Sequence, residues 1–467
     1  MEAQTQPDRT QYRLIITRRE ATEVLLSTQL SDWSLPRLEV LAGSRLADQL
    51  VAGVNQNYQL KTYCLWSKSV PPSSELLSPD RYAVMEALHQ NNEAPPATTW
   101  ISSAEVASEA TLGPADQATV RSSLEALNRY IAKPEVGPFA RPGWIEGLFC
   151  WVRDQIEPLG LRTTGRFQQL NASPTFSLVR IETTGPAVWF KATGEPNAHE
   201  LPISIALHRV FPNYVPRILG VHPTWNAWLS EEVPGSTLDD LADIQAWADV
   251  AKALAELQIA SVTKTNMFLE SGCRDLRLPQ LVEQIDPFLA RMSELMEMQT
   301  KQPPQILTDS ELSVLGDRLR AAFYELEQYR LPSTLGHLDL NPHNILVSPA
   351  RCCFLDWAEG CVTHPLFTFE YLREYSRRSL SEPDAVAETL VAAYLHPWQS
   401  FFSPETLAQA MAISPLVAVF AYAVAGKKWR SPETLQNPTM AGYLRSLTRR
   451  AYREAAKMPA RSGRCLA

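Results

Sequence analysis

The chain has 467 residues, more than one ordinary domain holds, so two or three domains are expected. Hydrophobic residues make up 45% of the chain and charged residues 20%, as in most globular proteins. A chain with a formal net charge of −8 has no electrostatic reason to hold a nucleic-acid backbone, which needs a basic face. We therefore predict that the protein has no nucleic-acid partner.

The N-terminus and the cysteine usage favour the cytoplasm. The first residues contain no apolar signal core, and we find no run of about 18 apolar residues that would predict a membrane span. The seven cysteines are scattered, odd in number and without any C-x-x-C pair. This usage argues against a disulfide framework or a zinc site and fits a reducing compartment. We expect a cytoplasmic protein with no membrane partner.

The N-terminal region has a mixed pattern of helices and strands. Short apolar runs predict strands over 12–16, 61–66 and 81–87, and helical spacing predicts helices over 46–55 and 114–127. Proline and glycine then cluster between 132 and 143, a composition that disfavours regular structure and often marks a linker. We therefore predict an α+β domain over 1–138.

The pattern changes after this cluster. Strand-like segments at 167–170, 176–181 and 188–192 are followed by a helix around 199–211 and by strands near 217–221 and 227–233. From residue 238 onward, apolar residues recur mostly at helical spacing. The sequence predicts a small antiparallel sheet with one helix over 145–234 and a larger helical lobe over 235–467.

The strongest functional signal lies in the predicted helical lobe. His337, Asp339 and Asn344 fit the pattern H-x-D-x-x-x-x-N, and Asp356 ends a short apolar strand that follows them. A turn at 348–350 predicts a hairpin that returns Asp356 to the other two positions. One carboxylate can accept the proton of a hydroxyl group, and an amide oxygen with a second carboxylate suits Mg²⁺. The pattern indicates phosphoryl transfer.

These residues resemble the aminoglycoside phosphotransferase and choline kinase superfamily, a group related to protein kinases. Its catalytic loop typically reads H-G-D-x-x-x-x-N-I-L and precedes an I-D-W segment, whereas Leu338 stands here in place of the usual glycine. The resemblance implies a protein-kinase-like bilobal fold with Asp339 as catalytic base. It also implies that Asn344 and Asp356 hold Mg²⁺ and that His337 supports the loop.

Glu359 and His364, which follow the predicted magnesium ligand Asp356 in the chain, also fit this resemblance. Glu359 lies where such enzymes often carry a further acidic residue, and its role is left open. His364 belongs to a segment similar to the family's G-H-P. We expect His364 to be a structural hydrogen-bonding residue rather than a catalyst.

Lys191 and Glu200 precede the catalytic loop in the order that a kinase requires. Lys191 lies at the end of a predicted strand, and Glu200 opens the next helix. In kinases, a strand lysine holds the α- and β-phosphates of ATP, and a helix glutamate fixes that lysine. The alternatives are a solvated lysine and a helix-favouring acid near the positive end of its helix. No G-x-G-x-x-G motif precedes Lys191, which leaves the phosphate-loop contacts open.

The segment around Glu231 and Val233 resembles the hinge between the lobes in this superfamily. Backbone groups of this segment would meet the adenine of the nucleotide. An ordinary strand end followed by a turn is the alternative interpretation, and both remain open.

Residues 1–138 resemble a Nudix-hydrolase domain in three features. These are the predicted helix at 46–55, the strand at 82–87, and the segment 99–106, which is similar to a strand-to-helix step of Nudix proteins. A Nudix box needs several carboxylates on one helix face to hold metal, whereas this helix offers only Asp48. We expect a Nudix-like domain without hydrolase activity, with an unrelated α+β domain as the alternative.

The sequence therefore predicts an ATP-dependent phosphotransferase that moves the γ-phosphate to a hydroxyl of a small molecule, with Mg²⁺ as cofactor. An amino sugar, a sugar and an amino alcohol are all candidate acceptors, and any protein partner is left open. A non-catalytic nucleotide-binding module is the alternative. A protein acceptor ranks last, because Trp357 and Ala358 replace the Phe-Gly that follows the magnesium aspartate in protein kinases.

Overall fold

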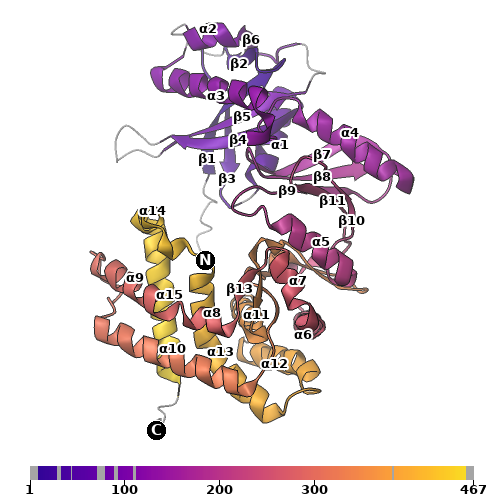
Figure 1. Ribbon diagram of the computed structural model, residues 1–467. Helices are drawn as coiled ribbons and strands as arrows, with labels where there is room; N and C mark the ends of the chain where they lie inside the picture. Colours follow the sequence, from indigo (N-terminus) through magenta and orange to yellow (C-terminus); the bar gives the residue numbers. More distant parts are fainter. Residues whose placement is uncertain are drawn as a thin grey trace, which may run out of the picture. The chain divides into compact units, whose positions relative to one another are not determined.

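The computed structural model describes residues 9–28, 33–43, 45–70, 79–88, 93–108, 112–380 and 383–458 (Figure 1). The chain forms two compact units. The first unit comprises Met1–Leu201 and Arg217–Glu232, and the second unit comprises Pro202–Pro216 and Val233–Ala467. Neither unit is one continuous segment, because a short stretch of each interrupts the other.

A six-stranded sheet begins the first unit. Its strand β1 pairs antiparallel with β2 and β3 and parallel with β5, while β4 extends the sheet beside β5 and β6 extends it beside β2. The strands are β1 (Arg9–Arg18), β2 (Glu23–Ser27), β3 (Arg37–Leu41), β4 (Thr62–Val70), β5 (Asp80–Ala87) and β6 (Thr98–Ser102). The helices are α1 (Leu46–Tyr58), α2 (Ser103–Ser108) and α3 (Pro114–Ala132).

Residues 14–16 of strand β1 are apolar without interruption because both faces of the strand are covered there. Side chains alternate across a strand, so neighbouring residues enter different cores. Leu14 and Ile16 pack in one core with buried residues of α1, while Ile15 packs in the other with buried residues of α3. This arrangement places β1 at the centre of the sheet.

The predicted strands and helices of the N-terminal region are present in the structure. The observed elements are mostly longer, as in β4 and α3. Strands β2 and β3 were not predicted from the sequence. Each has only five residues and is held by pairing with β1, which a local pattern does not reveal.

A five-stranded antiparallel sheet forms the second half of the first unit, in the order β10-β11-β9-β8-β7. The strands are β7 (Thr163–Ala172), β8 (Ser177–Thr183), β9 (Val188–Ala192), β10 (Ile218–Val221) and β11 (Ala227–Glu231), and α4 (Trp144–Ile156) precedes them. The predicted small antiparallel sheet is thus confirmed. The helix predicted with it is α5 (Glu200–Val210), most of which belongs to the second unit.

The two sheets of the first unit share one hydrophobic core. Phe139 and Trp144 pack edge to face with ring centroids 5.3 Å apart, and Phe139 also contacts Phe190 of β9. The side-chain amide of Gln169 in β7 bonds both backbone groups of Cys64 in β4, each at 2.8 Å. The segment predicted as a linker is therefore folded into this core.

Buried Glu86 of β5 fixes the end of the predicted linker. Its carboxylate accepts hydrogen bonds from the Tyr63 hydroxyl and, at 2.8 Å, from the backbone amide of Gly143, the residue before α4. The predicted division at 138–145 thus lies inside one compact unit. A separate N-terminal domain is not confirmed, and the domain ranges and the Nudix-like character of residues 1–138 stay predictions.

The second unit is mostly helical, with two three-stranded sheets, β12-β15-β16 and β13-β17-β14. Its strands are β12 (Ser236–Thr237), β13 (Arg274–Leu276), β14 (Thr334–His337), β15 (Ile345–Val347), β16 (Cys352–Phe354) and β17 (Gly360–Thr363). Its longer helices are α6 (Ile244–Ser261), α9 (Ile285–Glu297), α10 (Asp309–Tyr329), α11 (Pro365–Ser379), α12 (Pro383–Trp398), α13 (Pro404–Ala425) and α15 (Pro438–Lys457); the short ones are α7 (Thr265–Glu270), α8 (Leu278–Val282) and α14 (Pro432–Gln436).

Helix α13 lies at the centre of this unit and packs against α10, α11 and α15 (Figure 1). Among the described helices it alone is long and apolar enough to cross a membrane, although the sequence analysis found no such run. Its most apolar window is 72% buried inside the structure, as in the core helix of a globular protein.

Candidate active site

The catalytic loop joins β14 to the hairpin of β15 and β16 in the second unit. Asn344 ends a short 3-10 helix (Pro342–Asn344), and β15 and β16 then pair antiparallel from Ile345 with Phe354 to Val347 with Cys352. The Leu355 amide donates a hydrogen bond of 2.8 Å to the Asn344 carbonyl. The predicted hairpin therefore forms, and it returns the chain just before Asp356.

Buried His337 ties the two sides of this hairpin together. Its Nδ1 accepts a hydrogen bond of 3.1 Å from the Asp339 amide, so Nε2 carries the proton and donates to the Leu355 carbonyl at 3.0 Å. Burial lowers the pKa of His337, which keeps the ring neutral near pH 7. His337 thus positions the residues beside Asp339 and Asp356, as the sequence predicted.

The half-buried carboxylate of Asp339 is held in one orientation by two donors. Its Oδ1 accepts hydrogen bonds from Nδ2 of Asn341 at 3.2 Å and from the Tyr371 hydroxyl at 3.1 Å. Oδ2 accepts no hydrogen bond from the described residues. One carboxylate oxygen is therefore fixed, while the other is available to a hydroxyl acceptor.

Asn344 and Asp356 fit the donor set of a magnesium site. Nδ2 of Asn344 donates to the Asp339 carbonyl at 2.9 Å, which leaves its amide oxygen as the possible ligand. Exposed Asp356 has φ 62°, a left-handed conformation that few residues other than glycine, asparagine and aspartate adopt. The described residues contain no group of three or more His, Cys, Asp or Glu side chains placed so that they could hold a metal ion. Two protein ligands are enough, because Mg²⁺ usually takes its other ligands from water and nucleotide phosphates.

Lys191 and Glu200 meet within the first unit. Lys191 Nζ lies 2.5 Å from Oε1 of Glu200, whose side chain is only 2% exposed at the start of α5. The ammonium group also lies 5.8 Å from the centroid of the Trp228 ring. The pair has the arrangement with which kinases position a phosphate-binding lysine.

The predicted hinge lies where the chain leaves β11. The Glu231 amide donates to the Arg217 carbonyl at 2.9 Å, and the Glu232 amide donates to the Ala187 carbonyl at 3.2 Å. The Val233 amide donates to no group within the described ranges. Of the three backbone amides, only that of Val233 is therefore available to adenine.

Glu359 and His364 are structural residues. The Glu359 side chain pairs with Arg274, and its carbonyl accepts a hydrogen bond of 3.2 Å from the Leu338 amide. His364 is 1% exposed, and burial lowers its pKa to about 3. Neither ring nitrogen of His364 has a hydrogen-bond partner among the described residues, so its predicted hydrogen bonding was wrong.

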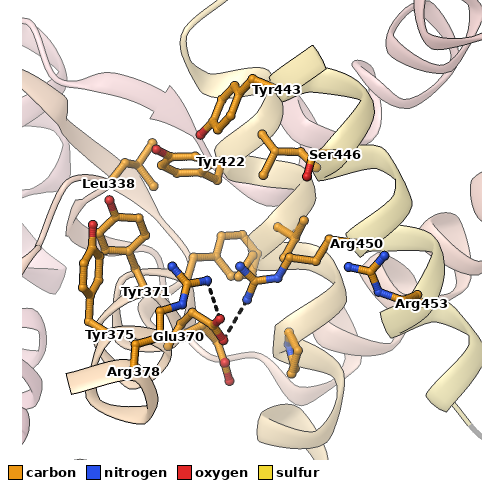
Figure 2. A pocket seen from close by; sticks show the side chains of 16 residues that line it. Leu338, Glu370, Tyr371, Tyr375, Arg378, Tyr422, Tyr443, Ser446, Arg450 and Arg453 are labelled. Carbon is orange, nitrogen blue, oxygen red and sulfur yellow. Dashed lines mark hydrogen bonds and ion pairs between the residues drawn. The ribbon is translucent and has the colours of Figure 1, made fainter. Parts of the chain in front are cut away.

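A cavity of about 490 Å³ adjoins the catalytic loop in the second unit (Figure 2). Leu338 lines it, and so does Tyr371, whose hydroxyl reaches Asp339. The rest of the wall comes from side chains of α11, α13 and α15. This volume is in the range of small-molecule sites.

Sequence reasoning missed this wall, which includes Tyr371, Tyr375, Tyr422 and Tyr443. Tyr371 and Tyr375 are four residues apart and therefore share a face of α11. That spacing was a usable signal. Nothing local in the sequence indicated that this face lies beside Asp339 or that α13 and α15 complete the wall.

Comparisons with known proteins give one family match. The model of the phosphotransferase enzyme family matches residues 199–408, a range that includes Glu200, the hinge and the catalytic loop but not Lys191. A search of curated proteins finds nothing that matches this chain.

Several solved structures are similar to parts of the chain. Macrolide 2′-phosphotransferase MphH from Brachybacterium faecium is 16% identical, with a TM-score of 0.43 over 64% of this chain and 97% of that one. Choline kinase LicA from Streptococcus pneumoniae is 13% identical, with a TM-score of 0.44 over 67% and 100%. An ethanolamine kinase from Plasmodium vivax is 14% identical, with a TM-score of 0.45 over 75% and 98%.

Proposed function

We propose that this chain, in which residues 199–408 belong to the phosphotransferase enzyme family, transfers the γ-phosphate of ATP to a hydroxyl group of a small molecule. The observation that carries the proposal is the geometry of Asp339. One of its carboxylate oxygens is held by Asn341 and Tyr371, and the cavity beside it has the size of a small-molecule site.

In this mechanism, Asp339 orients the acceptor and takes its proton. The acceptor hydroxyl donates a hydrogen bond to Oδ2 of Asp339, and its oxygen attacks the γ-phosphorus in line with the bond to the leaving oxygen. The bond between the γ-phosphorus and that oxygen breaks, ADP leaves, and the hydroxyl proton passes to Asp339. Tyr371 and Asn341 keep the carboxylate turned toward the acceptor throughout.

The other predicted residues hold the nucleotide. Lys191, fixed by Glu200, pairs with the α- and β-phosphates, and the Val233 amide with the carbonyl of Glu231 meets the adenine. Asn344 and Asp356 would hold Mg²⁺, which neutralises charge on the phosphates when it is bound. His337 keeps the backbone beside Asp339 and Asp356 in register.

The test is acceptor-dependent release of ADP by the purified full-length protein. Magnesium and ATP are supplied with sugars, amino sugars, amino alcohols and sugar acids, and the products are examined by mass spectrometry for one added phosphate. We expect a phosphorylated product that Asp339→Asn does not form. If the wild-type protein binds ATP but phosphorylates nothing, the non-catalytic nucleotide-binding role is favoured instead.

A further inference from the structure

The wall of the cavity beside Asp339 divides into an aromatic end and an arginine end. Figure 2 shows Leu338, Tyr371 and Tyr375 on the left of the view, with Arg378 beside the two tyrosines, and Arg450 and Arg453 on the right; Tyr422 and Tyr443 lie above the middle. Tyr371 and Tyr422 lie with ring centroids 5.4 Å apart, and Tyr371 carries the hydroxyl that reaches Asp339. The reacting hydroxyl of an acceptor therefore belongs at the aromatic end.

Both carboxylates of the wall are already engaged by arginines. Glu374 pairs with Arg378 at 2.6 Å and with Arg450 at 3.0 Å. Glu370, which is 8% exposed, accepts a hydrogen bond of 2.7 Å from Arg373 and another from the Ser414 hydroxyl. Neither carboxylate is left to pair with a cationic acceptor.

Arginine is in excess around the cavity. Arg378, Arg450 and Arg453 line it, against the two glutamates. Arg453 is exposed on α15, and within the described ranges it makes no ion pair or hydrogen bond. At this end an ammonium group finds no unengaged carboxylate among the lining residues, whereas the planar fork of an arginine matches a carboxylate or phosphate group.

We propose that the acceptor is a hydroxylated small molecule that carries an anionic group, a carboxylate or a phosphate, bound by Arg450 and Arg453. This assignment rests on the proposed phosphotransferase function and adds the chemical class of its acceptor. The hydroxyl to be phosphorylated lies toward Tyr371 and Asp339, and the anionic group lies toward α15. The phosphorylated product then carries one more anionic group than the acceptor did.

Four probes with the same sugar ring separate the possibilities. Glucose is neutral, glucosamine is cationic, glucuronate carries a carboxylate, and glucose 6-phosphate carries a phosphate. Binding to the full-length protein is measured by calorimetry with magnesium and ADP present, so that the nucleotide site is filled. We expect at least one anionic probe to bind about tenfold more tightly than glucose, and glucosamine to bind no more tightly than glucose.

Arg453→Gln is the decisive variant, because the side chain has no structural partner among the described residues. It should weaken binding of the anionic probe about tenfold and leave glucose binding unchanged. Arg209→Gln removes a charge from an exposed position on α5 that does not line the cavity, and it should bind all four probes as the wild-type protein does.

Tighter binding of glucosamine than of both anionic probes would overturn the assignment. So would anionic probes that bind no better than glucose, or an Arg453→Gln variant that binds them like the wild-type protein. Transfer is scored separately by comparing the wild-type protein with Asp339→Asn. If the proposed kinase function is wrong, the wild-type protein transfers no phosphate. If only the proposed anion site is wrong, the binding data alone contradict it.

Discussion

The catalytic loop and the wall of the cavity beside it lie in the same unit but are held by different kinds of contact. In the loop, backbone groups take part in the hydrogen bonds that place His337 and Asn344. In the wall, contacts run between side chains of α11 and α15, such as Glu374 with Arg450. A loop fixed by its own backbone preserves the chemistry, while a wall made of side chains can change its acceptor without disturbing that chemistry.

The largest expected effect comes from the loop. Asp356→Ala removes a predicted magnesium ligand, so kcat should fall about 10³-fold for every acceptor. Steady-state kinetics at several magnesium concentrations measure this effect, with Asp317→Ala, an exposed position on α10, as the matched control. Unchanged magnesium dependence in Asp356→Ala would remove this residue from the metal site.

The second prediction concerns the attachment of the loop to the hinge. Gly235 has φ 136°, and a Cβ at this position would lie 2.3 Å from the Val347 carbonyl oxygen in β15. Gly235→Ala should therefore lower the free energy of unfolding by about 3 kcal/mol. Urea denaturation measures the change. Gly442→Ala is the control, because its added Cβ meets nothing within 4 Å; equal stability of the two variants would contradict the account.

The same difference between loop and wall explains what the sequence could predict. The residues of the loop are close together in the chain, so their spacing alone indicated the hairpin and the chemistry. Lys191 and Glu200 are nine residues apart, and the strand and helix that bring them together were also visible as local patterns.

The wall and the shared core of the first unit depend on contacts between distant segments. Tyr371 meets Asp339 across 32 positions, and Gln169 meets Cys64 across 105. The sequence of one segment does not reveal which distant residue it contacts. The prolines and glycines clustered at 132–143 instead predicted a linker. The buried Phe139 shows that such a segment can belong to a core when an aromatic side chain anchors it.

Tyr371 lines the wall and also bonds Asp339 of the catalytic loop, so removing its hydroxyl group tests how the wall and the loop are connected. Tyr371→Phe keeps the ring in the wall but removes the hydrogen bond to Asp339, and kcat should fall about tenfold. Tyr324→Phe, at an exposed position on α10 that does not line the cavity, should leave kcat unchanged. Initial rates with one acceptor are sufficient to measure both variants. If the two variants are equally active, the bond from Tyr371 does not orient the carboxylate.

The last prediction concerns stability against pH rather than activity. His364 has a pKa of about 3 when folded and an ordinary value of 6.5 when unfolded, because burial disfavours its charged form. The unfolded chain therefore binds the extra proton first, and stability falls as pH drops from 6.5 toward 3. The slope from this residue is about 1.4 kcal/mol per pH unit.

Chemical denaturation between pH 4 and pH 7 measures this slope. His364→Leu should show a shallower loss of stability with acid than the wild-type protein, while buried His337 keeps its own contribution in both proteins. The same pH dependence with and without His364 would show that this residue is not buried in its neutral form.

The central claim is that Asp339 accepts the proton of the acceptor, and the most direct test is to measure transfer and nucleotide binding on one preparation of Asp339→Asn. We predict that kcat falls about 10³-fold while the Kd for ATP in the presence of magnesium stays within about twofold of the wild-type value. Transfer at a near wild-type rate would contradict the claim. Loss of ATP binding in parallel with transfer would also contradict it, because Asp339 would then serve the nucleotide rather than the acceptor.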